Sequence, residues 1–289
     1  MKWFALFLLF VATHACAVKD DYGNDLRLRE PARRIVSLAP HLTELLYDAG
    51  AGPKLVGAIE YSDFPPAARA LPRVGNDAGI SLEAVLALKP DLIVAWPNVG
   101  SRPAIDRLAA LGLPVFRSEP RELEDIPRTL ERLGALAGTE AQADQAAAEF
   151  RARLEALTRK YAMKPGEAPV RVFYEVWDRP LQTVNGQHII SKVIRLCGGE
   201  NVFAGLPLIA PEIDAEAVLK ADPEVIVAGD VNGARPAALD RWKAFPGLLA
   251  AAKNQLYAIP PDLMERHTPR LLEGAQRLCG LLDRARAAR

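Results

Sequence analysis

The sequence lacks the short motifs that mark the commonest metal, nucleotide and hydrolase sites. Its 289 residues include only three cysteines and four histidines, and the patterns CxxC, HExxH, GxGxxG, GxxxxGK(S/T) and GxSxG are all absent. Each pattern sets metal ligands, phosphate-binding glycines or a nucleophile at a fixed spacing. No set of nucleophile, base and orienting group can be recognised by spacing either. We therefore expect a protein that is not an enzyme and that holds no resident metal or cofactor.

An excess of charge of either sign is also lacking. The chain carries 36 basic and 36 acidic residues, for a formal net charge of zero, and the basic residues are scattered. A nucleic-acid-binding surface needs a basic patch or stripe, so we expect no nucleic-acid partner. Half of the residues are hydrophobic, which is enough for one large core or two moderate ones.

The longest apolar run is too short to cross the ~30 Å of hydrocarbon in a membrane. It lies in MKWFALFLLFVATHACA, where one lysine precedes about ten apolar residues and a tail of small ones, the layout of a secretory signal peptide. We predict a signal peptide over residues 1–17, cleaved after Ala17, and an exported protein. Lipid attachment at Cys16 is the alternative, although Thr13 stands where such signals usually have leucine.

The two remaining cysteines, Cys197 and Cys279, would lie in an oxidising compartment. We expect a disulfide between them, because thiols of exported proteins are commonly paired. Two buried, unpaired thiols are the alternative. The bond would close a loop of about 82 residues, for which the chain-entropy treatment gives roughly 4 to 5 kcal/mol.

One long helix is predicted over residues 139–164, between Gly138 and Pro165. The segment has no internal glycine or proline, it is rich in strong helix formers, and Thr139 suits the N-cap. Only one stripe needs burial, because its strongest apolar side chains recur at three- and four-residue steps: Phe150, Leu154, Leu157 and Tyr161. At about 1.5 Å per residue the helix would be roughly 39 Å long. We interpret it as a rigid connection between two lobes; an ordinary helix on a single core is the alternative.

Strand-like and helix-like segments alternate on both sides of this helix. Strands are expected at 35–38, 55–59, 92–96, 115–117, 170–176, 225–228 and 256–259, and helices at 42–49, 82–88, 103–111, 123–137, 188–196, 215–220, 235–244 and 268–284. This order is typical of parallel sheets covered by helices. We predict an α/β protein with an N-terminal lobe at 18–138, an interlobe helix at 139–164, a C-terminal lobe at 165–289 and a ligand cleft between the lobes.

A short repeat indicates that the lobes are equivalent. Residues 83–96 read EAVLALKPDLIVAW and residues 216–229 read EAVLKADPEVIVAG, so both copies open a helix, turn at a proline and end in an apolar strand. Glu83 and Glu216 then occupy equivalent first-turn positions, where the helix dipole favours a carboxylate. Alternatively, they offer one acidic contact per lobe to arginines of a two-fold symmetric partner.

Ligands of open parallel sheets bind at the carboxyl ends of the strands. The residues expected there combine flat aromatic rings with hydrogen-bonding groups: Pro40, His41, Tyr61, Trp96, Trp177, Asp262 and Arg266, with further candidates at 62–64, 97–98, 178–179, 230, 232, 264 and 267. This mixture suits a large, mostly apolar ligand with polar edges.

Each of these candidates also has an ordinary structural interpretation. The tryptophans could fill the ends of their sheets, and Asp262 and Arg266, four residues apart, could form a local ion pair. Three histidines near strand–helix junctions could instead converge on a metal ion: His41, His188 and His267.

Six segments carry a resemblance to a known family: RIVSLAPHLTELLYDAG, VGAIEYSDFPPAA, SLEAVLALKPDLIVAW, RLCGGENVF, EAVLKADPEVIVAG and PDLMERHTPRLLEGAQRLC. Together they make nearly all of the mature chain resemble the substrate-binding proteins of ABC importers with a helical backbone (class III), and among them the cobalamin (vitamin B12)-binding branch. The resemblance implies a monomeric periplasmic receptor that delivers cobalamin or a related corrinoid to a permease dimer in the inner membrane. A haem, iron-siderophore or metal-ion receptor of the same fold is the alternative.

The resemblance also implies roles for the residues of this chain that match family motifs. Tyr61 and Trp96 match aromatic residues that line the corrin site, and Asp262 and Arg266 match polar residues near the corrin amides. Glu83 and Glu216 match acidic residues that dock on permease arginines. Cys197 and Cys279 match a disulfide of the family. Asp77 and Ala210 stand where some cobalamin binders have tryptophans, so fewer aromatic walls are expected here. Trp177 would supply part of the missing surface.

Overall fold

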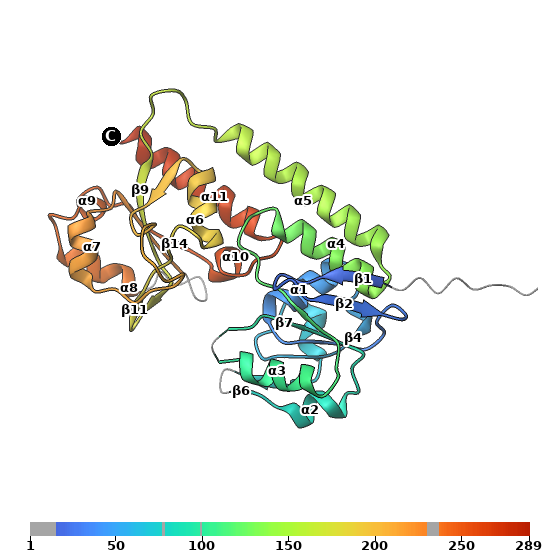
Figure 1. Ribbon diagram of the computed structural model, residues 1–289. Helices are drawn as coiled ribbons and strands as arrows, with labels where there is room; N and C mark the ends of the chain where they lie inside the picture. The colour runs from blue at the N-terminus through green and yellow to red at the C-terminus, as the bar shows by residue number, and fades with distance from the viewer. Residues whose placement is uncertain (1–15, 77–78, 99, 230–236) are drawn as a thin grey trace, which may run out of the picture.

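The computed structural model describes residues 16–289 except 77–78, 99 and 230–236, and it forms two α/β lobes joined along one long helix (Figure 1). The sheet of the N-terminal lobe is parallel, in the order β4-β3-β7-β8. The sheet of the C-terminal lobe is also parallel, in the corresponding order β12-β9-β13-β14. The predicted fold class is therefore confirmed.

The bounds of the sheet strands are β3 (Ile35–Ser37), β4 (Leu55–Ala58), β7 (Leu92–Ala95), β8 (Val115–Arg117), β9 (Val170–Glu175), β12 (Gly199–Asn201), β13 (Val225–Gly229) and β14 (Leu256–Ile259). All four residues of β7 are buried, as a strand inside a covered parallel sheet requires. Strand β12 is absent from the sequence-based prediction because its residues, Gly-Glu-Asn, have low β-propensity.

The helices are α1 (Pro40–Asp48), α2 (Leu82–Ala87), α3 (Arg102–Ala110), α4 (Asp125–Ala137), α5 (Glu140–Lys160), α6 (Ile189–Leu196), α7 (Ala215–Ala221), α8 (Ala237–Asp240), α9 (Leu249–Ala252), α10 (Pro261–Met264) and α11 (Leu271–Ala287). Short 3-10 turns occur at η1 (Gly52–Lys54), η2 (Pro66–Ala70) and η3 (Arg241–Ala244). Two-stranded hairpins pair β1 (Cys16–Lys19) with β2 (Asp25–Leu28), β5 (Gly75–Asn76) with β6 (Gly79–Ile80), and β10 (Trp177–Asp178) with β11 (Leu181–Gln182). Within residues 16–289, outside the three gaps, no helix combines the length and apolar character needed to span a membrane.

Helix α5 is the predicted interlobe helix, but it ends four residues before position 164. Tyr161 terminates it, ahead of the Pro165-Gly166 pair. Thr139 occupies the N-cap position without capping the helix, because its hydroxyl donates instead to the carbonyl oxygen of Ala49 at 2.6 Å. With 21 residues, α5 is roughly 32 Å long.

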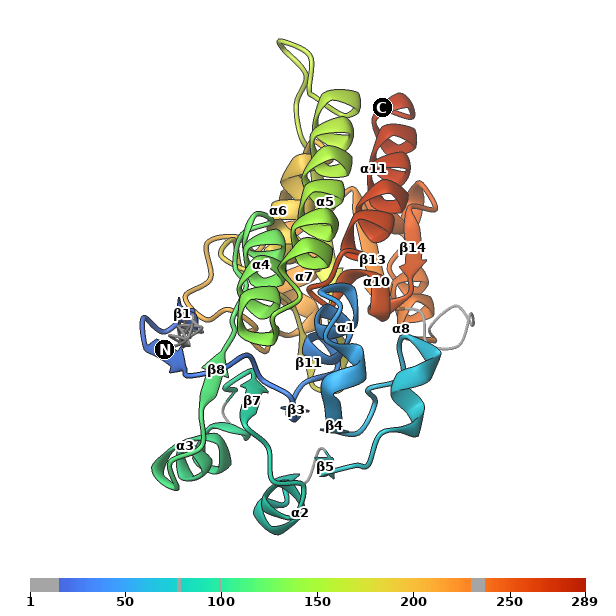
Figure 2. The same ribbon diagram turned by 90° about the vertical axis from the view of Figure 1, so that its right-hand side faces the viewer.

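One face of α5 is buried, as its apolar periodicity predicts. Phe150 is fully enclosed, while Leu154 and Leu157 are partly buried against the same hydrophobic core, which contains residues of both lobes. The approach of α4 to α5 is close, since a methyl group added at Gly134 would lie 2.3 Å from Cβ of Ala143. Figure 2 shows α4, α5 and α11 running side by side along this core.

The internal repeat has a structural counterpart. Lys89 and Asp222 end the two repeat helices with positive φ angles of 46° and 40°, each one residue before a proline. After the proline, the carboxylate of Asp91 accepts hydrogen bonds from the backbone that leads into β3, and that of Glu224 accepts one from the backbone of β9. The two lobes therefore share their strand order and the hydrogen bonds that join the segment after each repeat proline to the first strand of its sheet.

Ionic contacts hold the lobes together near α1. The carboxylate of Glu44, fully buried in α1, accepts two hydrogen bonds from the guanidinium of Arg270, both at 2.7 Å, and one from the hydroxyl of Thr268 at 2.6 Å. The Arg270 guanidinium also lies 3.9 Å from the ring centre of Phe64. Because Glu44 belongs to the N-terminal lobe and Arg270 to the C-terminal lobe, this buried network joins the two.

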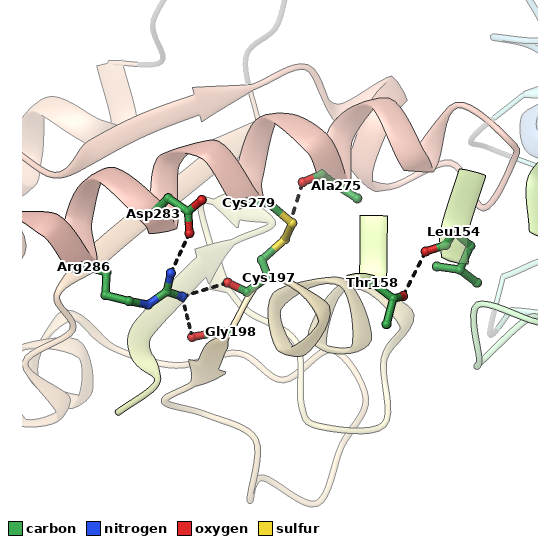
Figure 3. Close-up of a disulfide and its surroundings, with 8 residues drawn as sticks. All are labelled: Leu154, Thr158, Cys197, Gly198, Ala275, Cys279, Asp283 and Arg286. Atoms are coloured by element: carbon green, nitrogen blue, oxygen red, sulfur yellow. Dashed lines mark hydrogen bonds and ion pairs between the residues drawn. A yellow bond between two sulfur atoms is a disulfide. The ribbon is translucent and has the colours of Figure 1, made fainter. Parts of the chain in front are cut away.

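The disulfide between Cys197 and Cys279 is present, with an S–S distance of 2.03 Å, so that prediction is confirmed (Figure 3). It joins the end of α6 to α11, and both cysteines are fully buried. Arg286, on the next turns of α11, donates hydrogen bonds to the carbonyl oxygens of Cys197 and Gly198 at 3.1 and 3.3 Å. The second pair of contacts fixes α6 against α11 independently of the covalent bond.

Asp48, at the end of α1, gives a pH-dependent prediction. Burial, and then the charge of Glu44, raises the pKa of Asp48 from 3.8 to about 7. At pH values between about 4 and 7, Asp48 holds a proton in the folded protein that it releases in the unfolded chain. The free energy of unfolding therefore falls as the pH rises through this range. This difference corresponds to roughly 4 kcal/mol at full effect, and partial exposure reduces it.

We therefore expect Asp48→Asn to raise the free energy of unfolding by about 1 to 2 kcal/mol at pH 8 and hardly at all at pH 4. Urea unfolding of both proteins at the two pH values measures the difference. An equal gain at both would show that ionisation of Asp48 is not its cause.

Candidate functional site

A cavity of about 370 Å³ lies where the carboxyl ends of the two sheets face each other. We call it the central cavity. The N-terminal lobe contributes His41 after β3, Trp96 after β7 and residues 119–121 after β8. The C-terminal lobe contributes Val176, Val184, residues 187–190, Ile209, Ala210, Glu265 and His267. Most of this wall is apolar, with a few polar groups, which is the composition of a small-molecule site.

A second hollow of about 330 Å³, the side hollow, lies within the N-terminal lobe and shares Trp96 with the central cavity. Pro40, Tyr61 and Asn98 are among its other residues. Tyr61 is 60% exposed and has a positive φ of 61°, and Trp96 is 37% exposed. These two exposed rings offer flat apolar surfaces in the wall of the side hollow.

The other predicted ligand residues lie outside both hollows. Trp177 is 60% exposed on the β10–β11 hairpin, and its indole nitrogen donates to the carbonyl oxygen of Arg179 at 3.0 Å. Val176, which lies between β9 and β10, lines the central cavity. The structure places Trp177 next to it but in the wall of neither hollow.

Asp262 and Arg266 lie at the boundary between the lobes. They form the local ion pair considered above, at 3.0 Å, and Arg266 also binds Asp63 of the opposite lobe at 2.7 Å and the carbonyl oxygen of Tyr61 at 3.3 Å. Burial would raise the pKa of Asp63, but the hydrogen bond and charge of Arg266 outweigh it and lower that pKa. Arg266 thus joins the two lobes through Asp63 and the backbone of Tyr61.

Three histidines come together in the wall of the central cavity. The ring of His267 lies 5.8 Å from that of His41 and 5.5 Å from that of His188, and His41 in turn meets Trp96 edge to face at 5.6 Å. Burial, and then the charge of Arg266, lowers the pKa of His41 to about 4. Burial likewise lowers the pKa of His188 to about 4. The pKa of His267 is well below its usual value because of burial and its two histidine neighbours.

These rings meet in tilted and edge-to-face arrangements, with interplanar angles of 44° for His41 and His267 and 71° for His188 and His267. Among residues 16–289, leaving aside the gaps, no group of three or more His, Cys, Asp or Glu side chains has the arrangement to hold a metal ion. His188 also caps α6, since its Nδ1 accepts a hydrogen bond from the backbone N–H of Ile190 at 3.2 Å. The cluster therefore consists of neutral imidazoles around a cavity and is not a chelating site.

The carboxyl group of Glu265 faces the same cavity. Burial raises the pKa of Glu265 to about 7, against the opposing effect of a hydrogen bond from the hydroxyl of Tyr174 at 3.3 Å. Tyr174 is fully buried behind it, and its own pKa is raised well above the usual value by that burial and by Glu265. In its protonated form, Glu265 can donate a hydrogen bond to a carbonyl group of a ligand.

Sequence reasoning missed two groups of cavity residues. Residues 119–121 follow β8, so they lie at the carboxyl end of a strand like the cavity residues that the sequence did identify. Val184, Gln187 and Ile209 reach the cavity from loops, held by hydrogen bonds such as that from the N–H of Asn185 to the carbonyl of Ile209 at 2.9 Å. No local pattern marks the second group. The candidates Asp230 and Asn232, like Asp77, lie outside the described residues.

Glu83 and Glu216 lie far from the cavity, at the first turns of α2 and α7, and both are exposed. The helices begin alike, because Ser81 and Asp214 each accept a hydrogen bond from the backbone N–H three residues later. Figure 1 shows α2 and α7 at the outer parts of the two lobes, away from α5. The lobes therefore present one carboxylate each at equivalent positions.

The sequence matches the family described as periplasmic binding protein over residues 35–263. It is 38% identical to the vitamin B12-binding protein of Vibrio cholerae serotype O1 over 256 residues, which cover 87% of this chain and 90% of that protein. It is 39% identical to the vitamin B12-binding protein of Yersinia pestis over 252 residues, or 86% of each chain.

Solved structures agree with this similarity. The crystal structure of the periplasmic vitamin B12 binding protein BtuF of Vibrio cholerae superposes with a TM-score of 0.80 at 38% identity, over 88% of this chain and 98% of that one. The periplasmic heme-binding protein RhuT from Roseiflexus sp. RS-1 superposes with a TM-score of 0.74 at 23% identity, over 88% and 99%. At that identity the likeness to RhuT shows the fold alone.

Proposed function

We propose that this chain, which belongs to the periplasmic binding protein family, captures cobalamin or a related corrinoid and delivers it to an ABC transporter. The observation that carries the proposal is the similarity to vitamin B12-binding proteins at 38% identity over 87% of the chain, which includes both lobes and the helix between them. The aromatic entrance and the mostly apolar cavity suit a ligand of that kind.

In this proposal no reaction is performed on the ligand. Tyr61 and Trp96 contact the face of the corrin ring, and Pro40 and His41 contact its edge. Asp262 and Arg266 bond to peripheral amides when their mutual ion pair opens. Preformed walls reduce the ordering that binding requires, and a stiff α5 limits the closure of the lobes.

The location and partners belong to the same proposal. Residues 1–17 direct export to the periplasm, and the mature protein acts as a monomer that meets a permease dimer in the inner membrane. Signal peptidase cleavage after Ala17 would remove the first two residues of β1, which pairs with β2 through all four of its residues. Lipid attachment at Cys16 would keep that strand whole.

Binding of cyanocobalamin by the purified protein tests the proposal. We expect a single site by calorimetry, and we expect Trp96→Ala to weaken binding roughly 10- to 100-fold, because a large ring at the centre of a site carries much of the affinity. Trp177→Ala is the matched control. It removes an equally large ring that lies outside both hollows, and it should change affinity less than about twofold.

Absence of any heat or spectral change at high micromolar cyanocobalamin would exclude the corrinoid function. A parallel titration with haemin, an iron siderophore and divalent metal ions would then decide among the other receptors of this fold. If Trp177→Ala weakened binding as much as Trp96→Ala, the ligand would extend beyond the central cavity to the β10–β11 hairpin.

A further inference from the structure

We propose that His267 coordinates the cobalt ion of the bound corrinoid through a ring nitrogen, so that the protein favours corrinoids whose cobalt carries an exchangeable axial water. This inference rests on the proposed function. It assigns a direct metal contact to one side chain of the central cavity, and it defines the ligand class by the state of the cobalt.

His267 differs from the other two histidines in what its nitrogens do. Nδ1 of His188 accepts the hydrogen bond from Ile190, so in the neutral ring Nε2 keeps its proton and cannot bind a metal. Nε2 of His41 is sealed from solvent and has no hydrogen-bond partner. Within the described chain, His267 makes no hydrogen bond, lines the cavity and is absent from the sealed polar atoms. Among the three histidines, His267 is therefore the one for which the described chain leaves both ring nitrogens neither hydrogen-bonded nor sealed from solvent.

The backbone around His267 is held firmly. Its preceding neighbour, Arg266, is bound to Asp63 at 2.7 Å, and its following neighbour, Thr268, donates to Glu44 at 2.6 Å. The N–H of Thr268 also donates to the carbonyl oxygen of Arg266 at 2.9 Å, which closes a tight turn at His267. Metal ligands need this kind of support, because residues behind the ligand set its orientation.

The ring environment preserves the lone pair of His267. It lies between the rings of His41 and His188, at 5.8 and 5.5 Å, in a mostly apolar wall. Burial there disfavours the protonated imidazolium, and neutral imidazole is the form that binds metals. Glu265 and Arg266 are the charged or titratable groups nearest to His267 in sequence. Arg266 forms ion pairs with Asp63 and Asp262.

The proposed step is a ligand exchange at Co(III). A nitrogen–cobalt bond forms with the lone pair of His267, and the cobalt–oxygen bond to one axial water breaks, with the electron pair leaving on the water. The oxidation state of cobalt is unchanged, and no proton is transferred. A corrinoid with cyanide on both axial positions offers no easily exchanged water, so it should bind without this contact.

The test compares diaquacobinamide with dicyanocobinamide on the full mature chain. With diaquacobinamide, the bound corrin should show the visible absorption change that added imidazole produces. In His267→Gln we expect that change to disappear and affinity to fall at least about tenfold, within the range seen when metal sites are perturbed. Dicyanocobinamide should bind His267→Gln and the unaltered protein equally. In His267→Ala, without added imidazole, the absorption change should likewise be absent.

Two results would overturn the inference while leaving the proposed function intact. One is diaquacobinamide binding without the absorption change, and the other is an unaltered change in His267→Gln. Failure of both cobinamides and of cyanocobalamin to bind would instead remove the proposed function together with the inference. Circular dichroism of each variant establishes that it has folded.

Discussion

Replacing both Glu83 and Glu216 by alanine is expected to abolish corrinoid uptake while leaving corrinoid affinity unchanged. The two carboxylates are exposed at equivalent helix starts, one on each lobe. Among the described residues neither takes part in an ion pair, so both remain free to bind arginines of a two-fold symmetric permease with charge-assisted hydrogen bonds. Because both lie outside the central cavity, the ligand should not sense their loss.

Uptake of labelled cobalamin by cells in which this chain is the sole receptor measures the effect, with calorimetry on the purified variant. The matched control replaces Glu140 and Glu273, which are also exposed carboxylates at the first turns of helices but lie on α5 and α11. We expect normal uptake from that control. Lost affinity in the Glu83 and Glu216 variant would place these residues at the ligand, and normal uptake would exclude them from docking.

Glu44→Ala is expected to lower the free energy of unfolding by about 3 to 5 kcal/mol. The change leaves the guanidinium of Arg270, 19% exposed, without the carboxylate that now accepts two of its hydrogen bonds, and it also leaves the hydroxyl of Thr268 unpaired. An unpaired charge in a desolvated place costs more than the pair contributes when intact.

Urea unfolding measures the loss, and Glu155→Ala is the control. Glu155 pairs with Arg159 on the exposed face of α5, where side-chain exposures of 66% and 71% predict a change below about 1 kcal/mol. The double variant Glu44→Leu with Arg270→Met should recover much of the stability, since no charge is then left buried. A loss below about 1 kcal/mol in Glu44→Ala would mean that water reaches this junction and the ion pair does not stabilise it.

The order of helices and strands could be predicted from the sequence, because that order depends on local patterns. Apolar runs of four to six residues set the strands, and the repeat at Glu83 and Glu216 placed corresponding helices in the two lobes. The end of α5 was misplaced by four residues because residues 161–164 contain neither glycine nor proline, and Tyr161 continues the apolar stripe although the helix ends at Lys160.

The residues of the central cavity were only partly predictable from the sequence. His41 and Trp96 follow buried strands, and they do line it. The partners that decide the rest are distant in sequence: Glu44 and Arg270 are 226 residues apart, and Arg266 and Asp63 are 203 apart. No pattern in the sequence shows the β10–β11 hairpin either, on which the ring of Trp177 is 60% exposed and lines neither hollow.

The segment from Arg266 to Arg270 combines two kinds of contact within five positions. Arg266, Thr268 and Arg270 bind residues of the opposite lobe, while His267 between them lines the central cavity. A separation of the lobes must therefore shift the cavity wall at His267, and a ligand that displaces His267 must strain the contacts across the boundary. By thermodynamic linkage, a ligand that binds one position of this wall more tightly also favours one angle between the lobes. A docking partner that binds only that angle would therefore distinguish the ligand-bound protein from the free protein.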